Sequence, residues 1–100
     1  MILLIRRPSS ERARHLLFFS KPALWPAWPF LPLVRRKPGA EEECGLLYDP
    51  PTATQRQKVG VTVFLANLFL LPSSEQEFLA SPKEEFDSPE AAFGAGWRLD

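Results

Sequence analysis

His15 and Cys44 are the only histidine and the only cysteine of this 100-residue chain, and together they could form a nucleophile–base pair. In such a pair the imidazole accepts the thiol proton, and the thiolate attacks an electrophilic substrate. His15 precedes Leu16-Leu17-Phe18-Phe19 and Cys44 precedes Gly45-Leu46-Leu47, so both lie in apolar runs that are typical of a small core. A cysteine in such surroundings behaves as a small hydrophobic side chain. We therefore predict core positions for both residues and no catalytic dyad.

The other residues that could do chemistry are arranged without a recognisable motif. The serines lie at proline-rich turns and candidate helix caps, and no Gly-x-Ser-x-Gly elbow is present. Gly94-Ala95-Gly96 lacks the strand–loop–helix context of a phosphate-binding loop. Glu41, Glu42 and Glu43 offer oxygen ligands, but consecutive residues of a strand alternate between its faces and do not converge on one ion. We predict no catalytic residue, no metal site and no cofactor.

The charge of the chain is zero overall and strongly uneven along its length. Residues 1–38 carry eight basic residues and one acid, whereas residues 39–100 carry four basic residues and eleven acids. This asymmetry indicates either an anionic partner for the basic half or two halves that pack together and neutralise each other. A neutral total gives no long-range attraction to nucleic acid. We favour mutual neutralisation and keep nucleic-acid binding as an alternative.

The segment from Trp25 to Pro32 has a proline at every third position, at residues 26, 29 and 32. Each proline fixes its own φ at about −65° and moves the preceding residue into the extended region. We therefore expect an extended backbone, with the prolines on one ridge of a polyproline helix and Trp25 and Trp28 on another.

This Trp-Pro segment (residues 25–32) is also the candidate binding surface. Tryptophan and arginine are enriched at interface hot spots, although a fully exposed stretch of this kind would promote aggregation. We expect most of the segment to pack within the domain, with one tryptophan partly exposed. The candidate contact residues are Trp25, Trp28, Phe30, Arg35 and Arg36.

A hairpin is predicted immediately after the Trp-Pro segment. Residues 31–37 and 42–48 flank the turn residues Pro38-Gly39-Ala40. In an antiparallel register the basic residues 35–37 face the acidic residues 41–43, and each cross-strand pair contributes about 0.2–1 kcal/mol.

The apolar run Val59–Leu71 predicts a strand that is covered on both faces and lies at the centre of the sheet. Asn67 within this run needs a hydrogen-bond partner, which we expect to be a backbone group.

Helices are expected chiefly in the last third of the chain. Residues 13–20 are interpreted as a short strand, with a helical turn from Ser10 to Leu17 as the alternative. After Pro72, serine caps at Ser73-Ser74, Ser81-Pro82 and Ser88-Pro89 predict short helices that each place one phenylalanine, 78, 86 or 93, against the sheet. Trp97 is expected in the core or at the sheet edge.

These patterns predict an α+β fold: a small, mostly antiparallel sheet of three to five strands, with short C-terminal helices packed on one face. We expect one domain over residues 1–100, with residues 1–10 as a candidate flexible segment that could instead begin with an edge strand over residues 2–5. A single cysteine is typical of a reducing, cytoplasmic compartment. The longest uncharged apolar run, residues 59–72, is shorter than the roughly 20 residues of a membrane span.

The function expected from these observations is a non-enzymatic intracellular interaction or accessory domain that binds a protein partner or a second copy of itself. The alternative is nucleic-acid binding through the basic half, with Trp25, Trp28 and Phe30 as stacking platforms. A small enzyme without an identifiable catalytic motif is the third hypothesis.

Overall fold

The computed structural model describes the backbone of residues 3–50 and 60–100, and side chains from residue 11 onward within those ranges. The elements in chain order are α1 (Leu3–Ser20), η1 (Pro22–Leu24), β1 (Phe30–Arg35), β2 (Glu43–Tyr48), β3 (Val61–Phe64), η2 (Leu68–Leu70), α2 (Glu75–Leu79), β4 (Lys83–Phe86), α3 (Pro89–Gly94) and β5 (Arg98–Leu99), where η denotes a short 3-10 helix.

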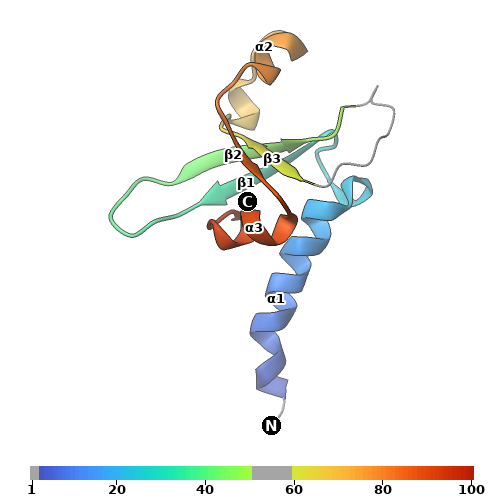
Figure 1. Cartoon of the computed structure of the whole chain (residues 1–100), viewed down its shortest axis with the longest axis vertical. Helices are drawn as coiled ribbons and strands as arrows, with labels where there is room; N and C mark the ends of the chain where they lie inside the picture. The colour runs from blue at the N-terminus through green and yellow to red at the C-terminus, as the bar shows by residue number, and fades with distance from the viewer. Residues whose placement is uncertain (1–2, 51–59) are drawn as a thin grey trace.

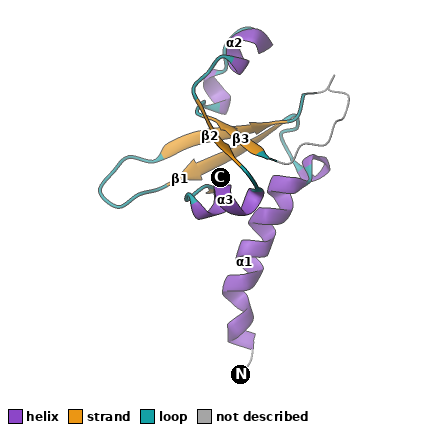
Figure 2. Cartoon of the chain, in the orientation of Figure 1, coloured by secondary structure: helices purple, strands orange, loops and turns teal. Residues whose placement is uncertain are grey.

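The five strands form one antiparallel sheet in the order β4-β3-β2-β1-β5 (Figure 1). The α+β class and the mostly antiparallel sheet are confirmed. Figure 2 shows the strands in orange between two groups of helices, with α2 on one side and α1 and α3 on the other. The late helices therefore divide between the two faces of the sheet, where the sequence suggested one face.

The hairpin prediction is confirmed, because β1 and β2 pair from Phe30↔Tyr48 to Arg35↔Glu43. Gly39 in the turn has a φ of 75°, a left-handed conformation that glycine adopts without steric cost. The opposing charges meet as expected, and Arg36 forms an ion pair with Glu42 at 2.6 Å. The local charge pattern was therefore sufficient to predict this register.

The Trp-Pro segment is not the extended polyproline ridge that its spacing predicts. It forms turns, in which the Trp28 N–H donates to the Trp25 carbonyl over 3.3 Å and the Phe30 N–H donates to the Ala27 carbonyl over 2.9 Å. Trp25 itself is extended, but a continuous extended strand begins only at Phe30, within β1. Pro32 lies inside that strand, and its carbonyl accepts a hydrogen bond from the Asp100 N–H. Pairing with β2 and β5 thus determines the conformation of the second half of the segment.

The strand predicted over Val59–Leu71 is wrong beyond Phe64, and β2 rather than this strand lies at the middle of the sheet. Residue 59 lies outside the described residues. After Phe64 the chain leaves the sheet, and Asn67 caps η2 by accepting the Phe69 N–H at its Oδ1 over 2.8 Å. The expected backbone partner for Asn67 is therefore confirmed, in a different local structure. A continuous apolar run does not distinguish a long buried strand from a short strand followed by an exposed turn.

Two further predictions of local structure are corrected. Residues 13–20 belong to α1, because His15 and Phe19 lie four residues apart on one buried helix face. The described residues of the possible edge strand, 3–5, are helical as well. The capping signal at Ser81-Pro82 precedes β4 instead of a helix, since residues 83–86 pair with β3 along their whole length.

The other two serine caps are confirmed. The Ser74 Oγ accepts the Glu77 N–H at the start of α2, and the Ser88 Oγ accepts the Ala91 N–H at the start of α3, both over 3.1 Å.

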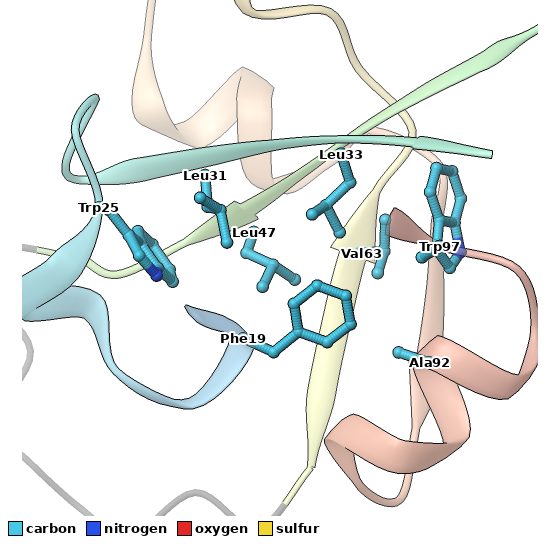
Figure 3. Close-up of a cluster of buried hydrophobic side chains, with 8 residues drawn as sticks. All are labelled: Phe19, Trp25, Leu31, Leu33, Leu47, Val63, Ala92 and Trp97. Carbon is cyan, nitrogen blue, oxygen red and sulfur yellow. The ribbon is translucent and has the colours of Figure 1, made fainter. Parts of the chain in front are cut away.

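Two hydrophobic clusters lie on opposite faces of the sheet. The larger cluster is drawn in Figure 3 and joins the sheet to α1 and α3; its buried members are Phe19, Trp25, Leu31, Leu33, Leu47, Val63, Ala92 and Trp97. The smaller cluster, Leu46, Phe64 and Phe78, joins the sheet to α2. Successive strand residues such as Leu46 and Leu47 enter different clusters, as the alternation of a strand requires.

Gly45 of β2 provides the space for Trp97, which is fully buried. A Cβ at position 45 would lie 2.6 Å from Val63 Cγ1 and 2.9 Å from Trp97 Cζ3. The sheet therefore accepts the indole only because this strand position has no side chain.

We predict that Gly45→Ala lowers the free energy of unfolding by about 1–3 kcal/mol, because the added methyl group overpacks the core. The measurement is urea denaturation followed by circular dichroism. Gly94→Ala is the matched control, since a Cβ there meets nothing within 4 Å. Equal stability of the two variants would show that Trp97 is not held against β2 in this way.

Candidate functional site

Arg35, at the end of β1, is the centre of a buried ion-pair cluster. Its Nη1 and Nη2 donate to the two carboxylate oxygens of Glu84 over 2.9 and 2.7 Å, and its Nε donates to Glu43 over 2.6 Å. The guanidinium carbon lies 4.3 Å from the centre of the Trp97 ring. Only 7% of Arg35 is exposed, so the predicted contact residue is an internal structural residue.

The Arg35 guanidinium changes the ionisation of both acids. Its hydrogen bonds lower the pKa of Glu84 below the usual value of 4.5, and a hydrogen bond from the Trp97 indole N–H acts in the same direction. A hydrogen bond from Arg35 likewise lowers the pKa of Glu43. The hydrogen bonds that Arg35 donates to Glu84 and Glu43 in turn raise the pKa of Arg35, so the guanidinium remains charged.

The other predicted contact residues are dispersed. Trp25 is buried with 7% of its surface exposed, and its indole N–H donates to the Phe18 carbonyl over 2.7 Å. Trp28 is 49% exposed, and its indole N–H donates to Asp49 over 2.8 Å. Arg36 is exposed at the opposite end of β1 from Trp28. The structure therefore does not bring the five residues together on one surface.

Phe30 belongs to an aromatic group on the α2 face of the sheet. Its ring stacks on Tyr48 with 5.0 Å between centroids and meets Phe78 edge-on at 5.5 Å. The Tyr48 hydroxyl donates to Glu75 over 2.7 Å. Burial is the main reason that the pKa of Tyr48 is raised to about 12, and this hydrogen bond to Glu75 is the second. These contacts attach α2 to the sheet and leave Phe30 half-buried.

The stacking surface required for nucleic-acid binding is not formed by the three predicted aromatic residues. Trp25 is inside the core, Phe30 is covered by Tyr48 and Phe78, and Trp28 alone is substantially exposed. Base stacking along a strand needs several open aromatic faces in sequence. The nucleic-acid hypothesis stays a prediction, without a stacking platform among the described residues.

His15 and Cys44 are placed in different environments. His15 is buried in α1, as its apolar neighbours predict, and its Nδ1 accepts the Leu99 N–H over 3.1 Å. Cys44 is exposed on β2, so the core position expected for it is wrong. The neighbouring residue Gly45 faces Trp97, and the alternation of the strand turns Cys44 to the other side. The described contacts of His15 therefore provide no base for Cys44.

The most exposed large apolar residues belong to neither predicted site. Phe69 is 88% exposed and Leu70 is 77% exposed, side by side in η2, and Leu71 and Leu79 are also exposed. We call Phe69, Leu70, Leu71 and Leu79 the apolar lobe. They come from η2, the residue after it and the end of α2, which lie together on one side of the sheet (Figure 1). Sequence reasoning missed the lobe because it placed residues 59–71 in a covered strand.

Among the described residues, no group of three or more histidine, cysteine or carboxylate side chains is positioned to hold a metal ion. None of the helices in the described ranges is long and apolar enough to cross a membrane.

The chain matches no protein-family model, no curated protein and no solved structure. The features that bear on function are therefore the exposed apolar side chains and the depressions of its own surface.

The Arg35 cluster predicts a loss of stability in acid. The folded-state pKa of Glu84 and of Glu43 lies below 4.5, so their stabilising effect is complete above that pH and is lost as the pH falls through the folded-state values. We expect Glu84→Gln to lower the free energy of unfolding at neutral pH by about 1–3 kcal/mol and to flatten its decline below about pH 4.5. Denaturant titrations at a series of pH values measure both effects.

Arg36→Gln is the control for this prediction, because its ion pair with Glu42 is solvent-exposed. We expect it to change stability by about 0.5 kcal/mol or less. An unchanged acid profile in Glu84→Gln would contradict the assigned role of Arg35.

The two tryptophans of the Trp-Pro segment should behave differently. Trp25→Ala is expected to lower the free energy of unfolding by about 3–5 kcal/mol, because it leaves a cavity in the core. Trp28→Ala should lower the free energy of unfolding by no more than about 2 kcal/mol, because the half-exposed side chain makes one hydrogen bond to the Asp49 carboxylate. Urea denaturation measures the free energy of unfolding of each variant. Similar decreases in the two variants would mean that Trp28 is part of the core.

Proposed function

We propose that this chain is a non-enzymatic interaction or accessory domain of the cytoplasm, and that the apolar lobe is its protein-binding surface. The observation that carries the proposal is the exposure of Phe69 and Leu70 on adjacent positions. Burying apolar surface releases about 25 cal/mol per Å², so two such residues in water favour association with a partner. The exposed free thiol of Cys44 supports a reducing compartment.

The apolar lobe is held in a defined conformation. Asn67 caps η2 at one end, and Leu68 packs against the cluster of Leu46, Phe64 and Phe78. The side chains of Phe69 and Leu70 are thus presented by an ordered turn whose neighbouring residues are anchored to the sheet. Such preorganisation reduces the entropy that is lost on binding.

The charge around the lobe indicates the chemistry of the partner. Glu75 and Glu77 lie on α2, next to the lobe in the chain, and Lys83 donates to the carbonyl of Leu79, a lobe residue, over 2.9 Å. These neighbours carry two negative charges and one positive charge. A groove that accepts Phe69 and Leu70 and has a basic rim would match both the shape and the charge of this surface.

A different protein fits the lobe better than a second copy of this chain. The lobe projects from the fold, so its partner must supply an apolar depression. A hollow on the α1 side of the sheet is lined mainly by charged side chains, including Arg12, Arg14, Arg36 and Arg98, and does not match an apolar lobe. Four apolar side chains also cover much less than the roughly 800 Å² per partner of a standard stable interface. These features support a transient complex with a groove-bearing protein.

The test is a pull-down from native lysate that compares the native chain with a double variant, in which Phe69→Ser and Leu70→Ser are combined. We expect the native chain to retain a protein that the double variant loses. The purified protein should bind the native chain with a micromolar dissociation constant and bind the double variant at least about tenfold more weakly, a difference of about 1.4 kcal/mol. Both residues are exposed, so the melting temperature should be nearly unchanged.

Leu24→Ser is the matched control, since Leu24 is an exposed leucine in the other 3-10 helix, η1. It should retain the same protein as the native chain. Identical protein profiles for all three chains would refute the proposal. Concentration-dependent sedimentation that the double variant abolishes would assign the lobe to self-association instead.

A further inference from the structure

A hollow of about 600 Å³ lies on the opposite side of the sheet from the apolar lobe. Its walls come from α1, α3, β5 and the end of the β1 strand, elements that meet near the C-terminus in Figure 1. Four arginines line it: Arg12, Arg14, Arg36 and Arg98. We call it the arginine pocket. It is an open and mainly polar depression of the surface, of the kind that suits a charged ligand rather than an apolar one.

The arginine pocket keeps a positive charge. Glu11 and Asp100 also line it, and Arg36 is paired with Glu42. Arg12, Arg14 and Arg98 therefore face two acidic side chains, a formal excess of one positive charge. Among the described side chains, no salt bridge joins Arg12, Arg14 or Arg98 to an acid. The cationic groups of α1 and β5 thus remain available to an anion.

Arg98 is fixed in place by the fold. Its guanidinium lies 3.6 Å from the centre of the Phe93 ring, and its Nη1 donates to the carbonyls of Phe93 and Trp97 over 2.8 and 2.9 Å. Arg12 approaches the same ring at 5.7 Å. A guanidinium that is already stacked and hydrogen-bonded loses little freedom when it binds an anion.

His15 forms part of the inner wall of the pocket. Its Nδ1 accepts the Leu99 N–H, so the neutral ring carries its proton on Nε2. The Nε2 atom makes no hydrogen bond to the described residues and is not fully enclosed by protein, and His15 lines the pocket. Burial, with the charges of Arg98 and Arg14, lowers the pKa of His15. The pocket therefore contains a neutral N–H donor among the arginines.

We propose that the arginine pocket binds a small phosphate-bearing molecule. Guanidinium groups bind phosphate oxygens in pairs, with charge-assisted hydrogen bonds of defined geometry. Arg12, Arg14 and Arg98 supply the charge, and the Nε2–H of His15 supplies a directed donor. The pocket is larger than one phosphate group, so inorganic phosphate or pyrophosphate would fill only part of it and a phosphate ester would fill more. This site is independent of the proposed protein-binding surface.

The experiment follows the imidazole of His15 by proton NMR, because the chain has a single histidine. Inorganic phosphate, pyrophosphate and phenyl phosphate are titrated separately at constant ionic strength. We expect saturable shifts of the imidazole signals, with a dissociation constant of about 1 mM or below for pyrophosphate or phenyl phosphate. A bound anion should also raise the pKa of His15. Tighter binding of phenyl phosphate would indicate an ester ligand, and tighter binding of pyrophosphate would indicate a diphosphate.

The decisive variant is Arg12→Gln with Arg14→Gln, which removes two positive charges from the exposed part of α1. It should weaken binding at least about tenfold. Lys21→Gln with Lys37→Gln removes the same charge from exposed positions outside the pocket and should bind as the native chain does. If the first double variant unfolds the domain, the single variant Arg14→Gln tests the same wall of α1 and should also weaken binding.

Three results would overturn the proposal. Shifts that do not saturate would show that no site exists, and equal weakening by both double variants would show that only net charge attracts the anion. A short oligothymidylate that displaces pyrophosphate and binds at least about tenfold more tightly would assign the arginines to a nucleic-acid backbone instead.

Discussion

The contact between Arg35 and Glu84 is the interaction on which the rest of this fold depends. The two residues come from β1 and β4, which are separated in the sheet by β2 and β3, so the ion pair crosses the whole face. Trp97 covers the guanidinium, and Gly45 leaves the space that the indole needs. A buried charge is costly without partners, and the loss of Glu84 leaves the Arg35 guanidinium with Glu43 as its only carboxylate partner. One guanidinium group therefore helps to hold both β4 and the residue before β5, Trp97, in position.

Local signals in the sequence predicted those parts of the fold that local interactions determine. The hairpin follows from a Pro-Gly turn between opposite charges, and Ser74 and Ser88 cap the helices that their positions indicate. Ser81-Pro82 carries the same capping signal but precedes a strand, because Glu84 pairs with Arg35 and its neighbours pair with β3. Contacts between residues this far apart in the chain cannot be read from a short motif.

The candidate sites were harder to predict than the fold for a related physical reason. Residue type indicated Trp25 and Arg35 as contact residues, but type does not determine burial, and both lie inside. Phe69 and Leu70 belong to a run that looks like a core strand, and only the end of pairing at Phe64 exposes them. The arginine pocket collects Arg12, Arg14 and Arg98 from the two ends of the chain, so no local pattern announces it.

The late position of Trp97 has a consequence for the order in which the domain can be assembled during synthesis. Arg35 and Glu43 lie eight residues apart and can meet as soon as the hairpin has left the ribosome. Glu84 and Trp97 emerge much later, and until then the part of the hairpin face around Gly45 and Arg35 lacks the Trp97 indole that covers it. Such long sequence separations slow the final closure of a sheet. A nascent chain that ends before residue 97 would therefore present an open half-sheet, the state in which this protein most needs protection from aggregation.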